Sequence, residues 1–426
     1  MTGTEPAGRL VLLDVALLDG KATPRRDGAY LAIRGPTIDE IGNAADFQAR
    51  ADDEILRLPD LVVMPGLIDA HLHLYASGST GEQPPDCFAS DLLPLIAVSN
   101  LDAHIDAGFT TVRDTGSENG RIWALRYAAQ EGMIRSPRII ACGKVLTVTA
   151  GHGTEYSVDM AWECDDMGDL IKAVRRQQHE GADYIKAIAC RRSSDGLGSI
   201  PAWPMEELSA AVEEAHMRDL KVSAHVMGED AIGTALRAGV DSLEHGWAGS
   251  DKLWRAAADA GTYLVPTLSV LHQKEVHAAA GRPIWPPAFD SVFGTLEGRL
   301  AECRRAHELG VPIALGTDAA NPGVLHGDGA MELELMVRAG LTPLDAIAAS
   351  TRDAACLCGI GDETGTLEIG KEADLLIVRG DPSSDVSVLR DRRRILGVIR
   401  AGRFLKGEAA LRCLSASPGS SRGDDR

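Results

Sequence analysis

The stretch MPGLIDAHLHL, residues 64–74, places two histidines one residue apart at the end of an apolar run. Residues i and i+2 of a β-strand project to the same face, so His71 and His73 point together while Leu72 points the opposite way. A buried strand is better served by Val, Ile or Leu than by imidazole. A lone His-x-His fits a metal site, but it also fits two buried histidines that have hydrogen-bond partners.

Outward from this stretch, between residues 65 and 362, short apolar segments alternate with amphipathic helical segments such as MEELSAAVEEAHMRDL. This alternation predicts βα units and a parallel sheet. Eight such units over about 300 residues are what an α/β fold of the (β/α)₈ TIM-barrel type requires. The eight expected strands are GLIDAHLH, FTTVRDT, PRIIACG, DYIKAIA, LKVSAHV, DSLEHG, TYLVPT and VPIALGTD.

Both ends of the chain have a different texture. Residues 1–64 carry apolar residues with period two and turn residues between them, and the same pattern returns in residues 363–410. Such patterns are typical of short antiparallel strands, so we expect one small β-sandwich domain built from both termini. Residues 411–426, which end in SASPGSSRGDDR, have the composition of a disordered tail.

The overall charge excludes some classes of partner. The chain of 426 residues has 43 Lys and Arg against 62 Asp and Glu, a net charge of −19, which repels nucleic acid and anionic membrane surfaces. The N-terminus lacks the basic start of a signal peptide, and no window approaches the roughly 18 apolar residues of a membrane span. The eight cysteines are scattered, which is typical of reduced thiols. We therefore expect a cytoplasmic protein.

Polar residues recur where the expected barrel strands end. The C-terminal ends of barrel strands meet at one rim, so these side chains are expected to lie together. Imidazole nitrogens and carboxylate oxygens are ligands of Zn²⁺, and the set predicts a metal centre. The set comprises His71 and His73 on the first strand, His152 just beyond the third, Lys186 on the fourth, His225 on the fifth, His245 on the sixth and Asp318 on the eighth.

Lys186 needs a separate explanation, because an ammonium is costly to bury and repels a divalent cation. One interpretation pairs it with Asp318 or with another carboxylate. The other is that its amine has added carbon dioxide. The resulting carbamate is an anionic ligand with two oxygens, able to bridge two cations between the flanking histidines.

Taken together, PGLIDAHLH, YIKAIA, SAHVMG, SLEHG, LGTDA and GTLEIGKEADLLIV resemble the metal-dependent amidohydrolase superfamily. The resemblance covers about residues 9 to 405 and is to the prolidase-like dipeptidases and carboxypeptidases related to ochratoxin-hydrolysing amidases. It implies that His71, His73 and Asp318 bind the more buried metal. His225 and His245 would bind the exposed one, and carboxylated Lys186 would bridge the two. Relatives often carry Gly-rich residues after the lysine, whereas this chain has CRRSSDG. The resemblance therefore does not define the residues of the substrate pocket.

The expected chemistry follows from two adjacent divalent ions, most plausibly Zn²⁺, which lower the pKa of a shared water. Asp318 would take the proton of that water and pass it to the leaving amine. The resemblance suggests that His152, between Gly151 and Gly153, touches the substrate, and His326 is a weaker pocket candidate. A further hypothesis concerns Arg191 and Arg192, which either clamp a substrate carboxylate or form ordinary salt bridges.

The favoured function is a binuclear amidohydrolase that cleaves an amide or peptide bond through a metal-bridging hydroxide. Its substrate would be a small molecule such as a dipeptide, an N-acyl amino acid or an ochratoxin-like aryl amide, possibly with a free carboxylate. The alternatives are hydrolysis of a cyclic amide, carbamate or urea linkage, a mononuclear deaminase of the same superfamily, and a non-catalytic scaffold. The relatives commonly assemble, so we also expect a homo-oligomer.

Overall fold

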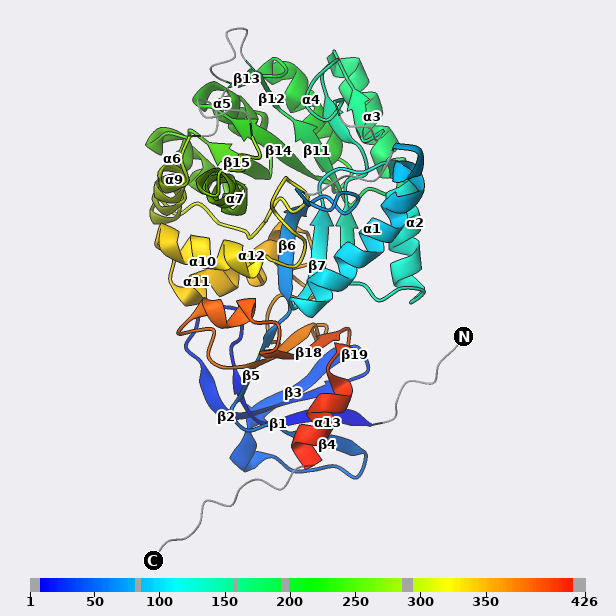
Figure 1. Ribbon diagram of the computed structural model, residues 1–426, viewed down its shortest axis with the longest axis vertical. Coiled ribbons are helices and arrows are strands. Elements are labelled where there is room, and N and C mark those ends of the chain that lie inside the picture. Colours follow the sequence, from blue (N-terminus) through cyan, green and yellow to red (C-terminus); the bar gives the residue numbers. More distant parts are fainter. Residues whose placement is uncertain (1–7, 81–85, 156–158, 193–198, 286–293, 417–426) are drawn as a thin grey trace, which may run out of the picture.

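The computed structural model describes residues 8–80, 86–155, 159–192, 199–285 and 294–416, with only the backbone for residues 86–90. An α/β part occupies the upper half of the view in Figure 1, and a β-sheet built from both ends of the chain lies below it. Among the described residues, no helix combines the length and the apolar character needed to cross a bilayer.

Most strands of the α/β part pair in parallel and form two sheets, and β12 (Cys190–Arg192) and β13 (Ser199–Pro201) form a separate antiparallel pair. Seven of the eight predicted strands are confirmed as β6, β7, β8, β11, β14, β15 and β16. One sheet has the order β6 (Leu67–Leu72), β7 (Phe109–Asp114), β8 (Arg138–Ala141). The other has the order β10 (Ala161–Glu163), β9 (Val145–Thr147), β11 (Tyr184–Ile188), β14 (Lys221–Met227), β15 (Ser242–Trp247), β16 (Tyr263–Val265).

The eighth predicted strand, residues 311–318, is wrong as a regular strand, and the paired strands do not close a ring. The segment keeps one bridge, between Leu264 and Ile313, and the amide of Ala70 donates to Leu315 O at 2.8 Å. It therefore runs between β16 and β6 without a continuous ladder. Three features explain this: Pro312 has no N–H to donate, a Cβ at Gly316 would meet His71 Cβ at 2.6 Å, and Asp318 has a φ of 57°.

Helices connect these strands and cover the outside of the sheets (Figure 1). Helix α3 illustrates why they form where they do: the Asp166 side chain accepts from Asp169 N at its start, and Gly181 ends it with a φ of 98°. Leu170 and Val174 on α3 face the core. The helices are α1 (Asp86–Asp106), α2 (Asn119–Gln130), α3 (Met167–Glu180), α4 (Met205–His216), α5 (Glu229–Ala238), α6 (Asp251–Ala260), α7 (Leu268–Ala279), α9 (Leu296–Glu308), α10 (Ala330–Ala339), α11 (Pro343–Ala349) and α12 (Arg352–Leu357).

The two ends of the chain share one mixed eight-stranded sheet, ordered β19-β18-β17-β5-β1-β2-β3 with β4 beside β1. Val63 of β5 pairs with Ile377 of β17, which joins the termini. Assembly from both termini is therefore as predicted, while a division into two packed sandwich layers stays a prediction. The strands are β1 (Arg9–Leu17), β2 (Arg26–Arg34), β3 (Thr37–Asn43), β4 (Asp53–Arg57), β5 (Leu61–Pro65), β17 (Leu375–Arg379), β18 (Ile395–Arg400) and β19 (Arg403–Lys406), with short 3-10 turns at Ala44–Asp46 and Val386–Arg390.

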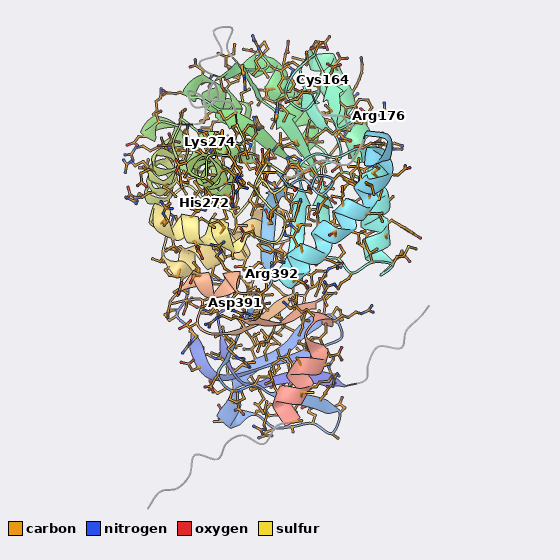
Figure 2. The ribbon with its side chains drawn as sticks, in the orientation of Figure 1. Cys164, Arg176, His272, Lys274, Asp391 and Arg392 are labelled. Atoms are coloured by element: carbon orange, nitrogen blue, oxygen red, sulfur yellow. The ribbon has the colours of Figure 1, made fainter. Side chains whose placement is uncertain are left out.

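The junction between the two parts combines apolar packing with polar contacts, since Leu376 of β17 belongs to the same buried cluster as Phe109 of β7. Arg392, labelled in Figure 2, donates to Gly327 O at 3.1 Å, and Lys406 Nζ donates to Asp106 O at 2.8 Å. The predicted boundaries 1–64, 65–362 and 363–410 stay predictions. Residues 411–416, predicted to be part of a disordered tail, instead belong to α13 (Glu408–Ala416), because the buried side chain of Leu411 anchors that helix. Residues 417–426 lie outside the described residues.

Candidate metal centre

Histidine rings from separate strands converge where those strands end. His71 on β6 lies 5.1 Å, between ring centroids, from His245 on β15, and His225 on β14 lies 4.6 Å from His245. The ring of His73, just beyond β6, is 5.8 Å from that of His71. The four predicted histidine ligands therefore form one cluster.

Asp318 completes the cluster from the segment opposite β6. Its Oδ1 lies 3.6 Å from Nε2 of both His71 and His73, and its Oδ2 lies 4.0 Å from His245 Nδ1. His71, His245 and Asp318 each offer a ligand atom, all within 4.8 Å of one another. These distances suit residues that can draw together around a cation.

Backbone strain aims two of these side chains. His245 has a φ of 66° and Asp318 a φ of 57°, a left-handed conformation that costs a non-glycine residue about 1–3 kcal/mol. Glu244 and His245 are consecutive, so strand alternation alone would send them to opposite faces. The left-handed turn at His245 instead lets its ring approach His71, which Glu244 also contacts.

The rings of His71, His73 and His245 each have a hydrogen-bond partner at Nδ1. His71 Nδ1 donates to Glu244 Oε2 at 2.5 Å, His73 Nδ1 donates to Gly116 O at 3.3 Å, and His245 Nδ1 is 2.8 Å from Thr267 Oγ1. Of their Nε2 atoms, that of His71 lies 3.6 Å from Asp318 Oδ1, that of His73 also lies 3.3 Å from Thr115 Oγ1, and that of His245 lies 2.9 Å from His225 Nδ1. Histidines that bind metals are oriented in this way by a partner on the second nitrogen.

Two buried polar atoms in the cluster have no hydrogen-bond partner in the described structure, Lys186 Nζ and Asp318 Oδ1. Burial lowers the pKa of the Lys186 ammonium, although the charge of Glu244 opposes this. Burial also raises the pKa of Asp318 to about 6, against the opposing charge of Lys186, and it lowers the pKa of His73 to about 3. Neutral imidazoles and an anionic oxygen are what a divalent metal centre needs, and the lowered pKa of Lys186 favours the form of the amine that can react, so the residues present fit such a centre.

Glu244 is a functional residue that the sequence reasoning missed. It is fully buried, and besides His71 its carboxylate contacts Arg113, Ser223 and Ser242. The alternation in SLEHG could have found it, because Ser242 and Glu244 share one face of β15. The alternative interpretation of Lys186, a pairing with Asp318 or with another carboxylate, finds no hydrogen bond in the described structure, and the cation that contacts Glu244 is Arg113.

Asp69, next to the paired histidines, holds the strand end to the Asp318 segment. Its Oδ2 accepts from Thr317 Oγ1 at 2.6 Å and its Oδ1 accepts from Thr317 N at 3.1 Å. Burial raises the pKa of Asp69 to about 7, and the bonds from Thr317 oppose that shift. Asp69 therefore fixes the distance between His71 and Asp318 without touching the centre itself.

His152 lies beside the cluster, with its ring 5.0 Å from that of His225 and its side chain 42% exposed. Its Nδ1 lies 2.6 Å from Glu155 Oε1. Burial would raise the pKa of Glu155, but the hydrogen bond and charge of His152 outweigh burial and lower that pKa to about 2. His152 is thus a half-exposed, oriented imidazole beside a predicted ligand, and its contact with substrate stays a prediction.

The remaining candidates divide into exposed and buried. Arg191 and Arg192 are exposed on β12 (Cys190–Arg192), which pairs with β13 (Ser199–Pro201). His326 is buried, and its Nε2 donates to Ala76 O at 2.8 Å. His104 is fully buried, with its Nε2 3.1 Å from His326 Nδ1 and its ring packed edge-on against Phe109.

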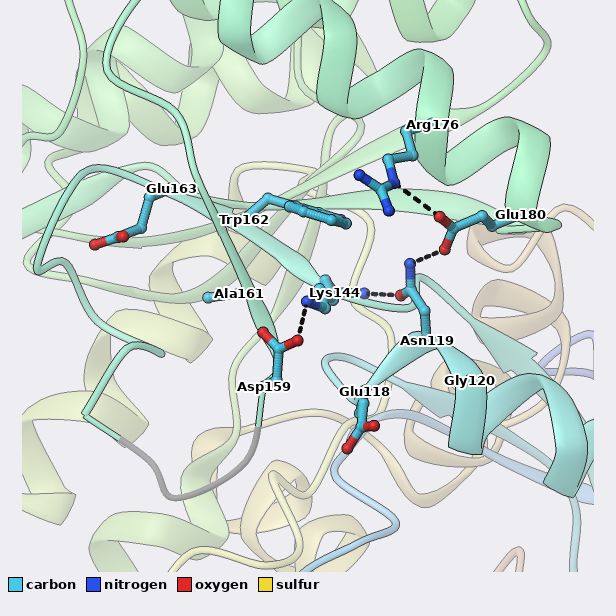
Figure 3. A pocket seen from close by; sticks show the side chains of 10 residues that line it. All are labelled: Glu118, Asn119, Gly120, Lys144, Asp159, Ala161, Trp162, Glu163, Arg176 and Glu180. Atoms are coloured by element: carbon cyan, nitrogen blue, oxygen red, sulfur yellow. Dashed lines mark hydrogen bonds and ion pairs between the residues drawn. The ribbon is translucent and has the colours of Figure 1, made fainter.

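A separate cavity of about 580 Å³ lies between α2, α3 and β10 (Figure 3). The Trp162 ring has Lys144 Nζ at 4.2 Å and Arg176 Cζ at 4.1 Å from its centroid. Both cations are paired, Lys144 with Asp159 at 2.5 Å and Arg176 with Glu180 at 2.9 Å. No predicted metal ligand lines this cavity, so its size does not make it the reaction site. Its lining residues are Glu118, Asn119, Gly120, Lys144, Asp159, Ala161, Trp162, Glu163, Arg176 and Glu180.

The fold and the histidine cluster together define a hydrolase of the amidohydrolase type. The amidohydrolase family matches residues 62–405, and the chain belongs to that family. It is 30% identical to ochratoxinase from Aspergillus niger over 442 residues, covering 96% of this chain and 88% of ochratoxinase. The chain therefore belongs among hydrolases acting on C–N bonds.

Two further relatives have different named activities. The structure of a Xaa-Pro dipeptidase with bound methionine superimposes with a TM-score of 0.82 at 29% identity, covering 94% of this chain and 100% of that chain. Imidazolonepropionase from Symbiobacterium thermophilum is 25% identical over 445 residues, covering 94% of this chain and 93% of its own length.

Proposed function

We propose that this protein is a binuclear metal-dependent amidohydrolase that cleaves the amide bond of a dipeptide, an N-acyl amino acid or an aryl amide of the ochratoxin kind. The observation that carries the proposal is the pair of buried, unpartnered atoms, Lys186 Nζ and Asp318 Oδ1, amid four histidines. Unpartnered buried polar atoms cost about 1–3 kcal/mol each. A protein retains such atoms where a ligand satisfies them.

The predicted ligands divide into two sets. His71, His73 and Asp318 would hold the more buried ion, and His225 with His245 the more exposed one. Carboxylated Lys186 would lie between the sets, its amine having lost a proton as it bonded to the carbon of carbon dioxide. When bound, two divalent cations, most plausibly Zn²⁺, supply the Lewis acidity that activates water and polarises the substrate carbonyl.

The proton transfers fall to Asp318. Its Oδ1 would accept a proton from the attacking water and return it to the amine that leaves. With a pKa of about 6, this carboxyl group is ionised at neutral pH and yet basic enough to take a proton. His152, exposed and held by Glu155, would donate to or accept from the substrate near the scissile carbonyl.

Substrate choice rests on the relatives and on the surface beyond β11. One relative is named for action on ochratoxin and another for cleavage of Xaa-Pro dipeptides. Arg191 and Arg192 follow Ala189, whose amide donates to His225 O at 3.0 Å, so the exposed arginines continue outward from the level of the cluster. We propose that one of them binds a substrate carboxylate.

The main alternative is hydrolysis of a cyclic amide, carbamate or urea linkage, which the similarity to imidazolonepropionase favours. A mononuclear deaminase has no use for Lys186, and a scaffold has no use for the full ligand set. Assembly into a homo-oligomer and a cytoplasmic location remain proposals from the sequence.

Metal analysis and a hydrolysis screen test the function together. Protein purified in bicarbonate should contain about two divalent ions per chain and should hydrolyse members of a panel of dipeptides, N-acyl amino acids and aryl amides. One ion per chain would favour the deaminase, and none would favour the scaffold. Activity confined to cyclic amides, carbamates or ureas would select the alternative. An unchanged KM for an acid-terminated substrate in both Arg191→Met and Arg192→Met would remove the carboxylate clamp.

A further inference from the structure

We propose that Glu244 is a positioning residue that fixes His71 as the tautomer protonated at Nδ1, so that the lone pair of Nε2 faces the metal centre. The inference rests on the proposed function, because it assigns a role toward the metals. Glu244 is not one of the predicted metal ligands, and it affects the centre through His71.

The contact between the two side chains determines the tautomer. Glu244 is 0% exposed, and its Oε2 lies 2.5 Å from His71 Nδ1. An ionised carboxylate can only accept hydrogen bonds, so Nδ1 carries the proton. In a neutral imidazole Nε2 then has none, and this atom lies 3.6 Å from Asp318 Oδ1. His71 therefore presents an acceptor atom to the centre.

Three further donors keep Glu244 ionised and in place. Its Oε1 accepts from Arg113 Nη2 at 2.7 Å, from Ser223 Oγ at 2.6 Å and from Ser242 Oγ at 2.7 Å. A guanidinium and two hydroxyls that all donate to one carboxylate oxygen favour the ionised form of Glu244. The donors come from β7, β14 and β15, so the carboxylate is fixed by three rigid strands.

The buried surroundings of Arg113 bear on why the protein keeps the negative charge of Glu244. Arg113 is 2% exposed, its Nε donates to Ala70 O at 2.5 Å, and its guanidinium lies 4.8 Å from the Tyr184 ring centroid. A buried ion pair is seldom more stable than apolar side chains of the same volume. An anion behind a metal-binding imidazole, by contrast, orients the ring and raises its basicity. The placement of Glu244 fits this second role.

Glu244→Gln makes a sharp test, because an amide has one accepting and one donating side. Arg113 can only donate, so the Gln oxygen is expected to turn to Arg113 and its NH₂ group to His71 Nδ1. His71 must then carry its proton on Nε2, which blocks the centre. Substituting Arg113→Met as well frees the oxygen to face His71, so the double variant should regain affinity for metal.

The measurement is Zn²⁺ affinity, with a fluorescent zinc indicator as competitor, on protein first freed of metal. Glu244→Gln should weaken Zn²⁺ binding about 10–100-fold, and the double variant with Arg113→Met should recover most of that loss. The matched control is Glu214→Gln, which removes another buried carboxylate, one that pairs with Arg175 on α3 and with Arg218 just after α4. The control should bind Zn²⁺ as the unsubstituted protein does.

A loss below tenfold in Glu244→Gln overturns the inference, and so does a double variant that binds as weakly as the single one. ¹⁵N NMR of the unsubstituted protein, with His71 assigned through His71→Asn, keeps the test valid if a variant fails to fold. Protonated Nδ1 and bare Nε2 support the inference, and the reverse overturns it. If the unsubstituted protein binds no Zn²⁺, the proposed function fails instead.

Discussion

Replacing Lys186 by Met is expected to raise the stability of the metal-free protein while it removes activity. Lys186 is 2% exposed, and its Nζ has no hydrogen-bond partner in the described structure. Met has a similar length and an adaptable apolar stem. Removing an unpartnered buried amine should return about 1–3 kcal/mol. At about 2 °C per kcal/mol for a chain of this size, Tm should rise by about 2–6 °C.

The assay is calorimetry of chelator-treated protein in buffer free of bicarbonate. Lys221→Met is the matched control, because Lys221 Nζ donates to Cys356 O at 2.5 Å. That amine is satisfied, so its loss should leave Tm unchanged or lower. In metal-loaded protein, Lys186→Met should bind fewer ions per chain and hydrolyse the best substrate of the screen at least about 100-fold more slowly.

Lys186→Met is expected to raise Tm of the metal-free protein and to lower the activity of the metal-loaded protein, and these opposite signs make the result decisive. A purely structural lysine would lose packing or a hidden contact on substitution, so Tm of metal-free Lys186→Met would fall. That fall would refute the argument that Nζ is held for a ligand. Full activity in Lys186→Met would refute the bridging role even if Tm rises.

Three further substitutions test other parts of the site. Asp318→Asn should lower kcat about 10²–10⁴-fold at matched metal content, because the amide cannot take a proton from water. His152→Asn should lower kcat/KM about 10–100-fold without changing the number of bound ions, which separates a substrate contact from a ligand. Burial raises the pKa of Glu332 to about 7, against bonds from Ser269 and Leu268. Folded protein thus keeps a proton that unfolded protein releases between pH 4.5 and 7. The free energy of unfolding in urea should therefore fall as pH rises through that window, by at most about 1.4 kcal/mol per pH unit. Glu332→Gln should flatten this dependence.

Much of the fold was predictable, because periodicity reports which residues face a core. Local sequence predicted the strands β6 and β14, and strand order predicted that the histidines at their ends lie together, as their rings do. The prediction of a regular strand at residues 311–318 failed for a physical reason. Its composition is that of a strand, but Gly316 lies against His71 and Asp318 turns into the left-handed region. Local composition contains neither constraint.

Buried polar partners were harder to predict than ligands. Glu244 and His104 look like ordinary polar residues in a strand and in a helix, and their burial depends on what faces them across the structure. Arg113 on β7 and Glu244 on β15 are 131 residues apart in the chain, and His326 follows His104 by more than two hundred residues. A single sequence gives no signal for such pairings. The adjacency of Glu244 to His245 was the one local hint.

The same features that suit this site to metal make the metal-free protein costly to fold. Lys186 Nζ and Asp318 Oδ1 are buried without partners, and His245 and Asp318 hold strained backbone conformations. A ligand that binds only the folded chain stabilises it by mass action, so metal binding would offset these costs and couple stability to occupancy. Glu244 then contributes to both stability and metal affinity, because it compensates the charge of Arg113 in the metal-free protein and orients His71 toward the metal. Stability and metal affinity should therefore respond together to changes at Glu244 and in opposite directions to changes at Lys186.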